Sequence, residues 1–141
     1  FWDHKNPGLK NTEKSFSIIN TQLEDSYLHY VCNIMKKKFN IGRIRFMVME
    51  PEYTYPVHHD FERRWHLAIE APRDSFMYFR LNDNYVFDED LINSVHGVGF
   101  HVPDDGFVYE IDTGMNHTAV NCGNFQQKID RVHLVFGEAI I

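Results

Sequence analysis

The 141-residue chain is short enough for a single domain, and its composition (43% hydrophobic, 15% aromatic, 24% charged) is that of a globular protein. Its 14 basic and 20 acidic residues give a net charge of −6, which argues against nucleic acid or an acidic membrane as the main partner. Two cysteines do not form a disulfide framework, and no run of about 18 apolar residues is present to span a membrane, so we expect a cytoplasmic protein.

The first 40 residues are expected to form an N-terminal arm followed by one amphipathic helix. Residues 1–14 are polar, start without Met or a signal-peptide pattern, and indicate a loop or ordered arm at a trimmed or partial N-terminus. An alternating stretch at 15–19 could be an edge strand, and the capping-box pattern at 21–24 predicts a helix over about 22–38. We expect the apolar face of this helix to lie against a sheet; its residues are Leu23, Tyr27, Tyr30, Val31, Ile34, Met35 and Phe39.

From residue 41 onward the sequence is typical of a β-protein, with short strands separated by Pro, Gly, Asn and Asp. Strands are predicted at about 43–50, 54–60, 64–71, 75–81, 84–88, 97–102, 106–111, 115–121 and 130–140, with either strand or a short helical turn at 89–96. This pattern predicts a mainly β fold, a double-stranded β-helix (a cupin-like jelly roll) with the helix packed on its outer face. We expect one domain over 1–141, with the arm and helix at 1–40 and the jelly-roll core at 41–141.

The stretch from Tyr55 to Asp60 places two imidazoles and one carboxylate within three residues. In an extended segment alternate side chains share a face, so His58 and Asp60 point the same way and His59 points the opposite way. A further imidazole, His117, follows a turn-like segment at 112–114. Two histidines and one carboxylate can cover one face of a metal ion and leave positions open, which suits non-haem Fe(II). His59 remains the alternative to His58 as a ligand.

Five segments together resemble the Fe(II)/2-oxoglutarate-dependent oxygenases, in particular the aspartyl/asparaginyl β-hydroxylase-like group that also includes bacterial proline hydroxylases. They are His58-His59-Asp60, Arg64-Trp65-His66-Leu67, Gly106 to Asp112, His117 to Asn121, and Arg131 to Phe136, in the order found in that family and within about two-thirds of the chain. Two departures are visible. Some β-hydroxylases lack the carboxylate that Asp60 supplies here, and the 14-residue gap from His117 to Arg131 is longer than usual, with an inserted turn at 123–128.

The resemblance implies a role for each matching residue. His58, Asp60 and His117 would hold Fe(II), leaving three positions for a bidentate 2-oxo acid and O₂. Arg131 would anchor the distal carboxylate of 2-oxoglutarate, since a guanidinium forks onto a carboxylate and stays charged when buried; an edge-strand Arg in water is the alternative. The remaining candidates are cofactor-binding Arg64 and His66, and the weaker substrate or pocket residues Asn121, His133, Trp65 and Tyr78. For His66 a core histidine bonded to a carbonyl, and for the aromatic residues plain packing, remain open.

The function implied is a dioxygenase (hydroxylase) that acts on an amino acid, or on an Asp, Asn or Pro side chain in a peptide. It would use Fe(II), O₂ and 2-oxoglutarate as co-substrate. Its partner would be a small-molecule or peptide substrate, with neither nucleic acid nor membrane involved. Two alternatives are a cupin-type enzyme binding Zn²⁺ or Mn²⁺ through His58, His59 or His66 with His117, without 2-oxoglutarate, and a non-catalytic jelly-roll binding module. Substrate identity and oligomeric state do not follow from the sequence.

Overall fold

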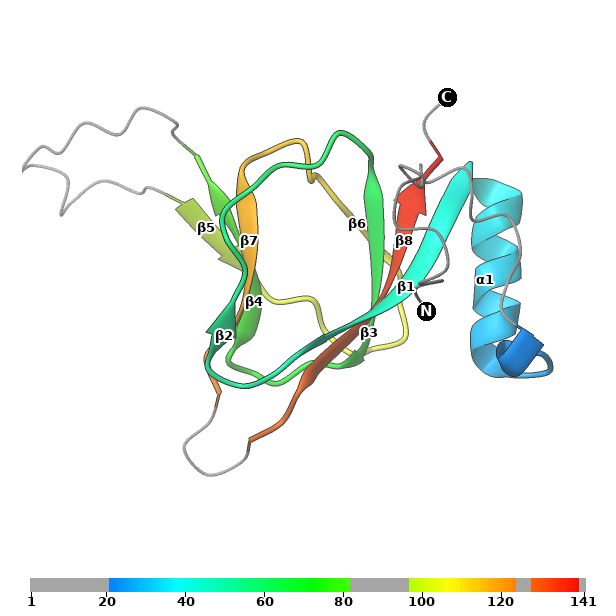
Figure 1. Ribbon diagram of the computed structural model, residues 1–141, viewed down its shortest axis with the longest axis horizontal. Helices are drawn as coiled ribbons and strands as arrows, with labels where there is room; N and C mark the ends of the chain where they lie inside the picture. The colour runs from blue at the N-terminus through cyan, green and yellow to red at the C-terminus, as the bar shows by residue number, and fades with distance from the viewer. Residues whose placement is uncertain (1–20, 82–96, 124–127, 140–141) are drawn as a thin grey trace, which may run out of the picture.

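The computed structural model describes residues 21–81, 97–123 and 128–139, which form one α-helix and eight β-strands (Figure 1). A 3₁₀ turn at Thr21–Leu23 precedes the helix. The elements in chain order are α1 (Tyr27–Lys38), β1 (Ile41–Met49), β2 (Tyr53–Thr54), β3 (Arg64–Glu70), β4 (Ser75–Arg80), β5 (Gly97–Phe100), β6 (Tyr109–Ile111), β7 (His117–Asn121) and β8 (Arg131–Glu138). No helix in these ranges is long and apolar enough to cross a membrane.

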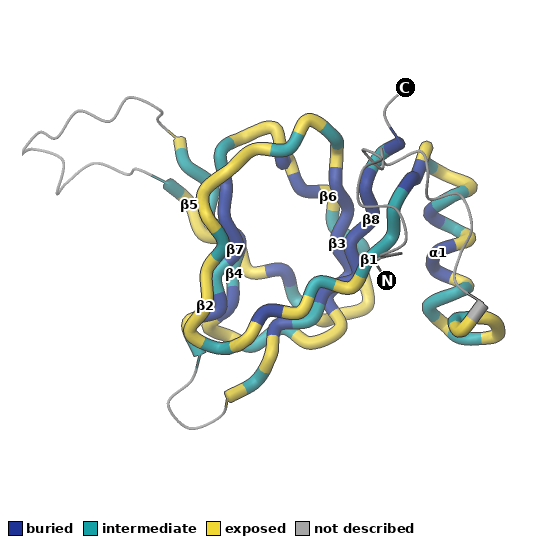
Figure 2. The backbone as a smooth tube through the Cα atoms, in the orientation of Figure 1, coloured by how far each residue is buried: buried dark blue, intermediate teal, exposed yellow. Residues whose placement is uncertain are grey.

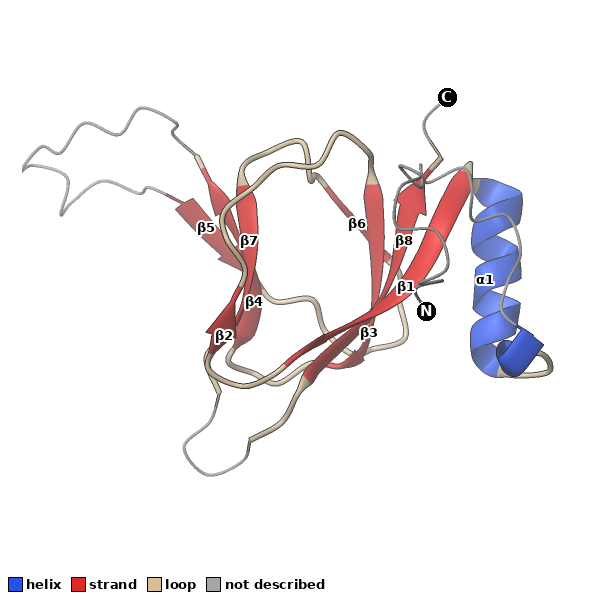
Figure 3. Cartoon of the chain, viewed as in Figure 1, coloured by secondary structure: helices blue, strands red, loops and turns tan. Residues whose placement is uncertain are grey.

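The strands pair from the two ends of the β-region inward, β1 with β8, β2 with β7, β3 with β6 and β4 with β5, all antiparallel. Such a ribbon of strand pairs, wound so that successive pairs fall in alternate layers, gives two four-stranded sheets. Their strand orders are β1-β8-β3-β6 and β2-β7-β4-β5, and the sheets face each other across the interior (Figure 3). This is the predicted double-stranded β-helix, and the fold prediction is confirmed.

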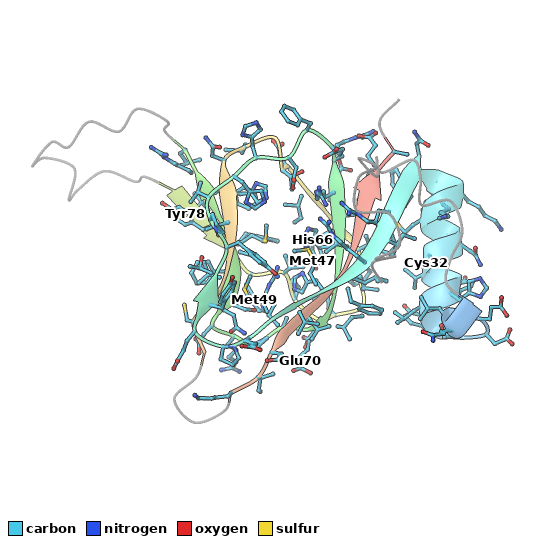
Figure 4. All side chains as sticks on the ribbon, in the orientation of Figure 1. Cys32, Met47, Met49, His66, Glu70 and Tyr78 are labelled. Atoms are coloured by element: carbon cyan, nitrogen blue, oxygen red, sulfur yellow. The ribbon has the colours of Figure 1, made fainter. Side chains whose placement is uncertain are left out.

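Helix α1 covers the outer face of the β1-β8-β3-β6 sheet (Figure 1). Its buried side chains are Val31, Cys32 and Met35, and Figure 4 shows Cys32 on the side of α1 that faces β1. These residues form one hydrophobic cluster with the outward-facing side chains of the sheet, namely Ile41, Trp65, Leu67, Leu134 and Phe136. The predicted position of the helix on the outside of the jelly roll is therefore correct.

A second cluster fills the space between the two sheets and consists of Met49, Ala68, Met77, Val102, Ile111 and Ala119. Because side chains alternate along a strand, β3 contributes to both clusters, with Trp65 and Leu67 on the face towards α1 and Ala68 on the interior face. Figure 2 shows that β3, β7 and β8 are buried over most of their length. The two central strands of the β1-β8-β3-β6 sheet, β8 and β3, are thus buried over most of their length, and the polar side chains on their inner faces are removed from water.

The helix begins later than predicted. Its N-cap is Ser26, whose Oγ accepts a hydrogen bond from the backbone N–H of His29 at 3.1 Å, so the capping-box pattern at 21–24 does not start it. Asp25 adopts a positive φ of 62° and separates the 3₁₀ turn from α1. With this start, Tyr27 and Tyr30 are 65% and 63% exposed and do not belong to the apolar face.

Several strand boundaries also differ from the prediction. The strand expected over 54–60 is reduced to β2, followed by an isolated bridge between His58 and His117. The strand expected over 106–111 is reduced to β6. The predictions for 15–19, 84–88 and 89–96 lie outside the described residues.

Candidate metal centre

His58 and His117 lie directly opposite each other on two antiparallel segments. The backbone N–H of His58 donates to the carbonyl of His117 at 2.9 Å, and the N–H of His117 donates back at 2.8 Å. Residues that exchange both hydrogen bonds have side chains on the same side of the sheet. Their ring centroids are accordingly 4.6 Å apart. Two histidines that are 59 positions apart in the sequence (117 − 58) are therefore neighbours.

Backbone carbonyls fix the tautomer of both rings. Nδ1 of His58 lies 2.8 Å from the carbonyl oxygen of Pro56, and Nδ1 of His117 lies 2.8 Å from that of Met115. A carbonyl only accepts, so each Nδ1 carries the proton and each Nε2 keeps its lone pair. Metal-binding histidines are commonly held in this way, with the second ring nitrogen donating to a carbonyl or carboxylate.

Asp60 completes the set. Its backbone N–H donates to the carbonyl of Thr113 at 2.8 Å, which ties the segment after His58 to the turn before β7. Its Oδ2 lies 3.8 Å from Nε2 of His117, and one donor atom from each of the three residues lies within 4.8 Å of the others. Two imidazole nitrogens and one carboxylate oxygen at this spacing fit a single divalent transition-metal ion.

Arg64 holds the carboxylate of Asp60 in place. The guanidinium Nη2 donates to Oδ1 at 3.0 Å, and Nε lies 2.8 Å from Oδ2. Arg64 is only 7% exposed, so this ion pair is largely shielded from water. The prediction placed Arg64 in cofactor binding; the structure shows its guanidinium on Asp60 and Glu62, the latter at 3.6 Å.

His59 points away from the other two residues. It is exposed, and its ring meets that of Phe61 edge to face at 5.2 Å. The structure thus brings together His58 and Asp60 with His117 and leaves His59 outside the cluster, as the alternation of side chains indicates.

His117 is held in its neutral form. Burial lowers the pKa of this imidazole, while the hydrogen bond to the Met115 carbonyl raises it in part; His58 lowers it further, and Asp60 opposes that effect. A neutral imidazole is the form that binds a metal.

Deeper in the interior, Arg131 is buried with 2% of its surface exposed. Its Nη2 lies 3.4 Å from the sulfur of Met77 and 3.1 Å from Nδ1 of His133. Among the residues that the structure describes, none places a carboxylate within ion-pair distance of it. Burial lowers the pKa of the guanidinium to about 10, so it is still charged at neutral pH.

The register of β4 relates Arg131 to the metal ligands. Phe79 pairs with His117 and Met77 pairs with Ala119. The contact with Met77 therefore puts the guanidinium two residues, roughly 7 Å, along the strand direction from His117. Arg131 and the triad border the same interior.

His66 and His133 lie between these two features. Nδ1 of His66 is 3.2 Å from Nδ1 of His133, and both residues are buried. Burial lowers the pKa of His66 well below its usual range, with further lowering by His133 and Arg131. Burial and Arg131 likewise lower the pKa of His133 to about 3. Both rings are neutral at physiological pH. Figure 4 shows His66 on the inner side of its sheet, together with Met47 and Met49.

Two aromatic residues predicted for the pocket are not there. Trp65 faces α1, stacks against Phe39 at a centroid distance of 4.7 Å, and donates its indole N–H to Glu110 at 3.1 Å. Tyr78 lies on the face of β4 opposite Met77, where its ring occupies the space that a Cβ on Gly97 would need. Period two puts both on the outer faces of their sheets.

Asn121 is buried, but its amide does not face a ligand. Nδ2 donates to the carbonyls of Met49 and Ile129 at 3.0 and 3.1 Å, and Oδ1 accepts from the N–H of Gly123 at 3.3 Å. These bonds occupy both amide donors. The predicted role in substrate contact is replaced by one in joining β1, β7 and the segment before β8.

Two side chains that the sequence analysis did not single out contribute to the interior. Phe79 lies with its ring centroid 5.9 Å from that of His117, and Met77 contacts Arg131. Strand alternation on β4 could have identified both, once the inner face of this strand was known.

The fold and this cluster together define a class, a cupin-like jelly roll with a candidate mononuclear metal centre of two histidines and one aspartate. No protein family matches the chain, and no curated protein matches it. Among solved structures, the crystal structure of CapF with the inhibitor 3-isopropenyl-tropolone is 17% identical, with a TM-score of 0.48, over 72% of this chain and 26% of that one. The capsular polysaccharide assembling protein CapF from Staphylococcus aureus is 18% identical, with a TM-score of 0.48, over 71% of this chain and 24% of that one.

The chain thus spans about a quarter of the length of these two structures. Similarity at this level does not establish a relationship. The jelly-roll assignment rests on the strand pairing. The assignment of the metal centre rests on the spacing of the three donor groups and on the tautomers of the two imidazoles.

Proposed function

We propose that the chain is an Fe(II)- and 2-oxoglutarate-dependent dioxygenase that hydroxylates an amino acid, or an Asp, Asn or Pro side chain in a peptide. One observation carries the proposal. A buried guanidinium, Arg131, has no carboxylate partner among the described residues and borders the same interior as the His58, Asp60 and His117 cluster. An unpaired buried charge is costly. A ligand with a carboxylate at one end would pair with the Arg131 guanidinium, and a 2-oxo acid group at its other end would bind the metal held by the cluster.

In this proposal His58, Asp60 and His117 hold Fe(II) through two Nε2 atoms and one carboxylate oxygen. Fe(II) with 2-oxoglutarate and O₂ supplies the oxidative decarboxylation to succinate and CO₂ that is coupled to hydroxylation of a C–H bond. The carbonyls of Pro56 and Met115 keep both imidazoles in the tautomer that coordination requires.

Arg131 would bind the carboxylate at the other end of the co-substrate. A guanidinium presents paired N–H donors to a carboxylate, and burial strengthens that interaction because water does not compete. Arg64 restrains Asp60 from the side, which keeps its carboxylate aimed at His117. The inner faces of β4 and β8 would exclude water from the reacting groups.

The direct test is turnover of 2-oxoglutarate. Purified protein with Fe(II), O₂ and 2-oxoglutarate should form succinate slowly even without a substrate, measured by chromatography of the acids. Arg131→Gln should raise the Kd for 2-oxoglutarate by roughly 10–100-fold, because a charge-assisted bond is lost, while Fe(II) binding is retained. Arg63→Gln is the matched control, because Arg63 is an exposed arginine that pairs with Glu138 on the surface.

Asp60→Ala should abolish Fe(II) binding in an anaerobic titration. Because Asp60 also pairs with Arg64, the unfolding of each variant is measured in parallel, and His58→Ala, at the exposed end of the cluster, serves as a second ligand variant. Metal binding without 2-oxoglutarate binding would support a cupin-type metal enzyme of another kind. Absence of metal binding would support a binding module.

A further inference from the structure

His133 carries a buried hydrogen-bond donor that nothing in the described part of the chain uses. The residue is 1% exposed, and its Nε2 has no hydrogen-bond partner there. A buried polar atom left unpaired destabilises the fold, so an atom of this kind commonly marks a place where a ligand or a water binds.

The protonation state of this ring follows from its neighbours. A guanidinium has only donors, so Nδ1 of His133, at 3.1 Å from Nη2 of Arg131, must be the acceptor. The proton of neutral His133 is therefore on Nε2. Nδ1 of His66, at 3.2 Å from the same atom, must then also donate. Arg131 in this way sets the tautomers of two histidines.

This arrangement assigns different tasks to the two rings. His66, with its proton on Nδ1, keeps a lone pair on Nε2 and can only accept through that atom. His133, with its proton on Nε2, has a free N–H in the interior beside a charged guanidinium. The charged guanidinium of Arg131 and the neutral Nε2–H of His133 are neighbours, and together they can bind the two oxygens of a carboxylate.

We propose that the Nε2–H of His133 is a second donor, beside Arg131, to the carboxylate bound in the interior, and that its Nδ1 orients the guanidinium for the same ligand. The ligand class is a dicarboxylate, and this assignment rests on the proposed function. His133 and Arg131 lie two residues apart on one face of β8, so one strand provides both donors without any movement of the backbone.

Two substitutions separate the two tasks of His133. Asn places its amide near the position of Nδ1, so His133→Asn keeps an acceptor for Arg131 and loses the distal donor. Gln places its amide near the position of Nε2, so His133→Gln keeps the distal donor and loses the acceptor. His133→Phe loses both, and His29→Asn on α1 is the control outside the jelly roll.

The test is calorimetric binding of 2-oxoglutarate and of glutarate to the anaerobic Mn(II)-loaded protein. His133→Asn should weaken binding by roughly 10–100-fold, the range for one hydrogen bond to a charged group, whereas His133→Gln should stay within about threefold of wild type. Equal affinity of the Asn variant and wild type would overturn the proposal. Loss in the Gln variant alone would also overturn it, because His133 would then only position Arg131.

Histidine ring NMR on the wild-type protein gives a readout that does not depend on the folding of any variant. The proposal expects a protonated Nε2 on His133 whose proton resonance moves downfield when glutarate is added. An Nε2–H resonance that does not respond to a bound dicarboxylate would refute it.

The outcomes also distinguish this proposal from the proposed function. Binding of glutarate that requires the distal donor, without any succinate formed from 2-oxoglutarate, would support the inference and refute the oxygenase. Succinate formation with an unchanged KM for 2-oxoglutarate in His133→Asn would support the oxygenase and refute the inference. Failure of the wild-type protein to bind any dicarboxylate would refute both.

Discussion

Replacement of Arg131 by Met should make the ligand-free protein more stable while it removes the binding of 2-oxoglutarate. The guanidinium is 2% exposed and lacks an acidic partner in the described part of the chain. Burial lowers its pKa to about 10, which means that the fold disfavours the charged form. A tenfold change in proton affinity corresponds to about 1.4 kcal/mol, so the charge costs the folded state roughly 3 kcal/mol.

The net gain is smaller than this cost, since the substitution also removes a donor from His133. We expect the free energy of unfolding to rise by about 1–3 kcal/mol, in keeping with the effect of replacing buried charges by apolar side chains. Arginine is charged in both the folded and the unfolded chain at neutral pH. The gain should therefore be nearly independent of pH between about 6 and 8.

Urea denaturation of the metal-free protein at pH 7.5 measures this gain. Arg63→Met is the matched control: its side chain is 58% exposed, and loss of its surface ion pair with Glu138 should leave the free energy of unfolding nearly unchanged. If Arg131→Met were less stable than wild type by more than about 1 kcal/mol, the guanidinium would have an internal structural partner. A functional reason for its burial would then no longer be needed.

Three further predictions concern stability. Asn121→Ala should lower the free energy of unfolding by about 2–4 kcal/mol in urea, because two backbone carbonyls lose their donors; a change below about 1 kcal/mol would show that water replaces the amide. Gly97→Ala should lower the thermal midpoint, because its Cβ meets the Tyr78 ring, and Tyr78→Ala in the same chain should restore part of the loss; an unchanged midpoint in the single variant would contradict this packing. Burial lowers the pKa of both His66 and His133, so the unfolded chain binds more protons at acidic pH; stability is complete above about pH 6.5 and falls as the pH drops below it, and for His133, whose pKa is about 3, the fall continues to about pH 3 at up to about 1.4 kcal/mol per pH unit. The free energy of unfolding should depend less steeply on pH in His133→Asn than in wild type. Equal slopes would contradict the lowered pKa of His133.

The parts of the site that were predictable are those that depend on strand alternation alone. Period two separates His59 from its neighbours and puts Arg131 and His133 on one face of β8, and the structure has both arrangements. The order of turns and strands was also sufficient to predict the jelly roll. These features are local, so short-range geometry determines them.

The predictions that were wrong concern which face of a strand is the inner one. Because α1 covers the outer face of β3, side chains on both sides of that strand are buried from Arg64 to Ala68, and the sequence alone does not show which side Trp65 is on. On β4 the aromatic Tyr78 was chosen over Met77, although the ring lies outside and the thioether lies inside. The helix start was missed for a related reason. A capping box is a local signal, and the positive φ of Asp25 delays the helix to Ser26.

The most direct test of the account is a crystal structure of the protein with Mn(II) and 2-oxoglutarate, prepared without oxygen. We expect an anomalous peak for one ion between Nε2 of His58, the Asp60 carboxylate and Nε2 of His117, with the distal carboxylate of the ligand on Arg131. An ion bound at other residues, or a ligand whose carboxylates do not reach the guanidinium, would contradict it.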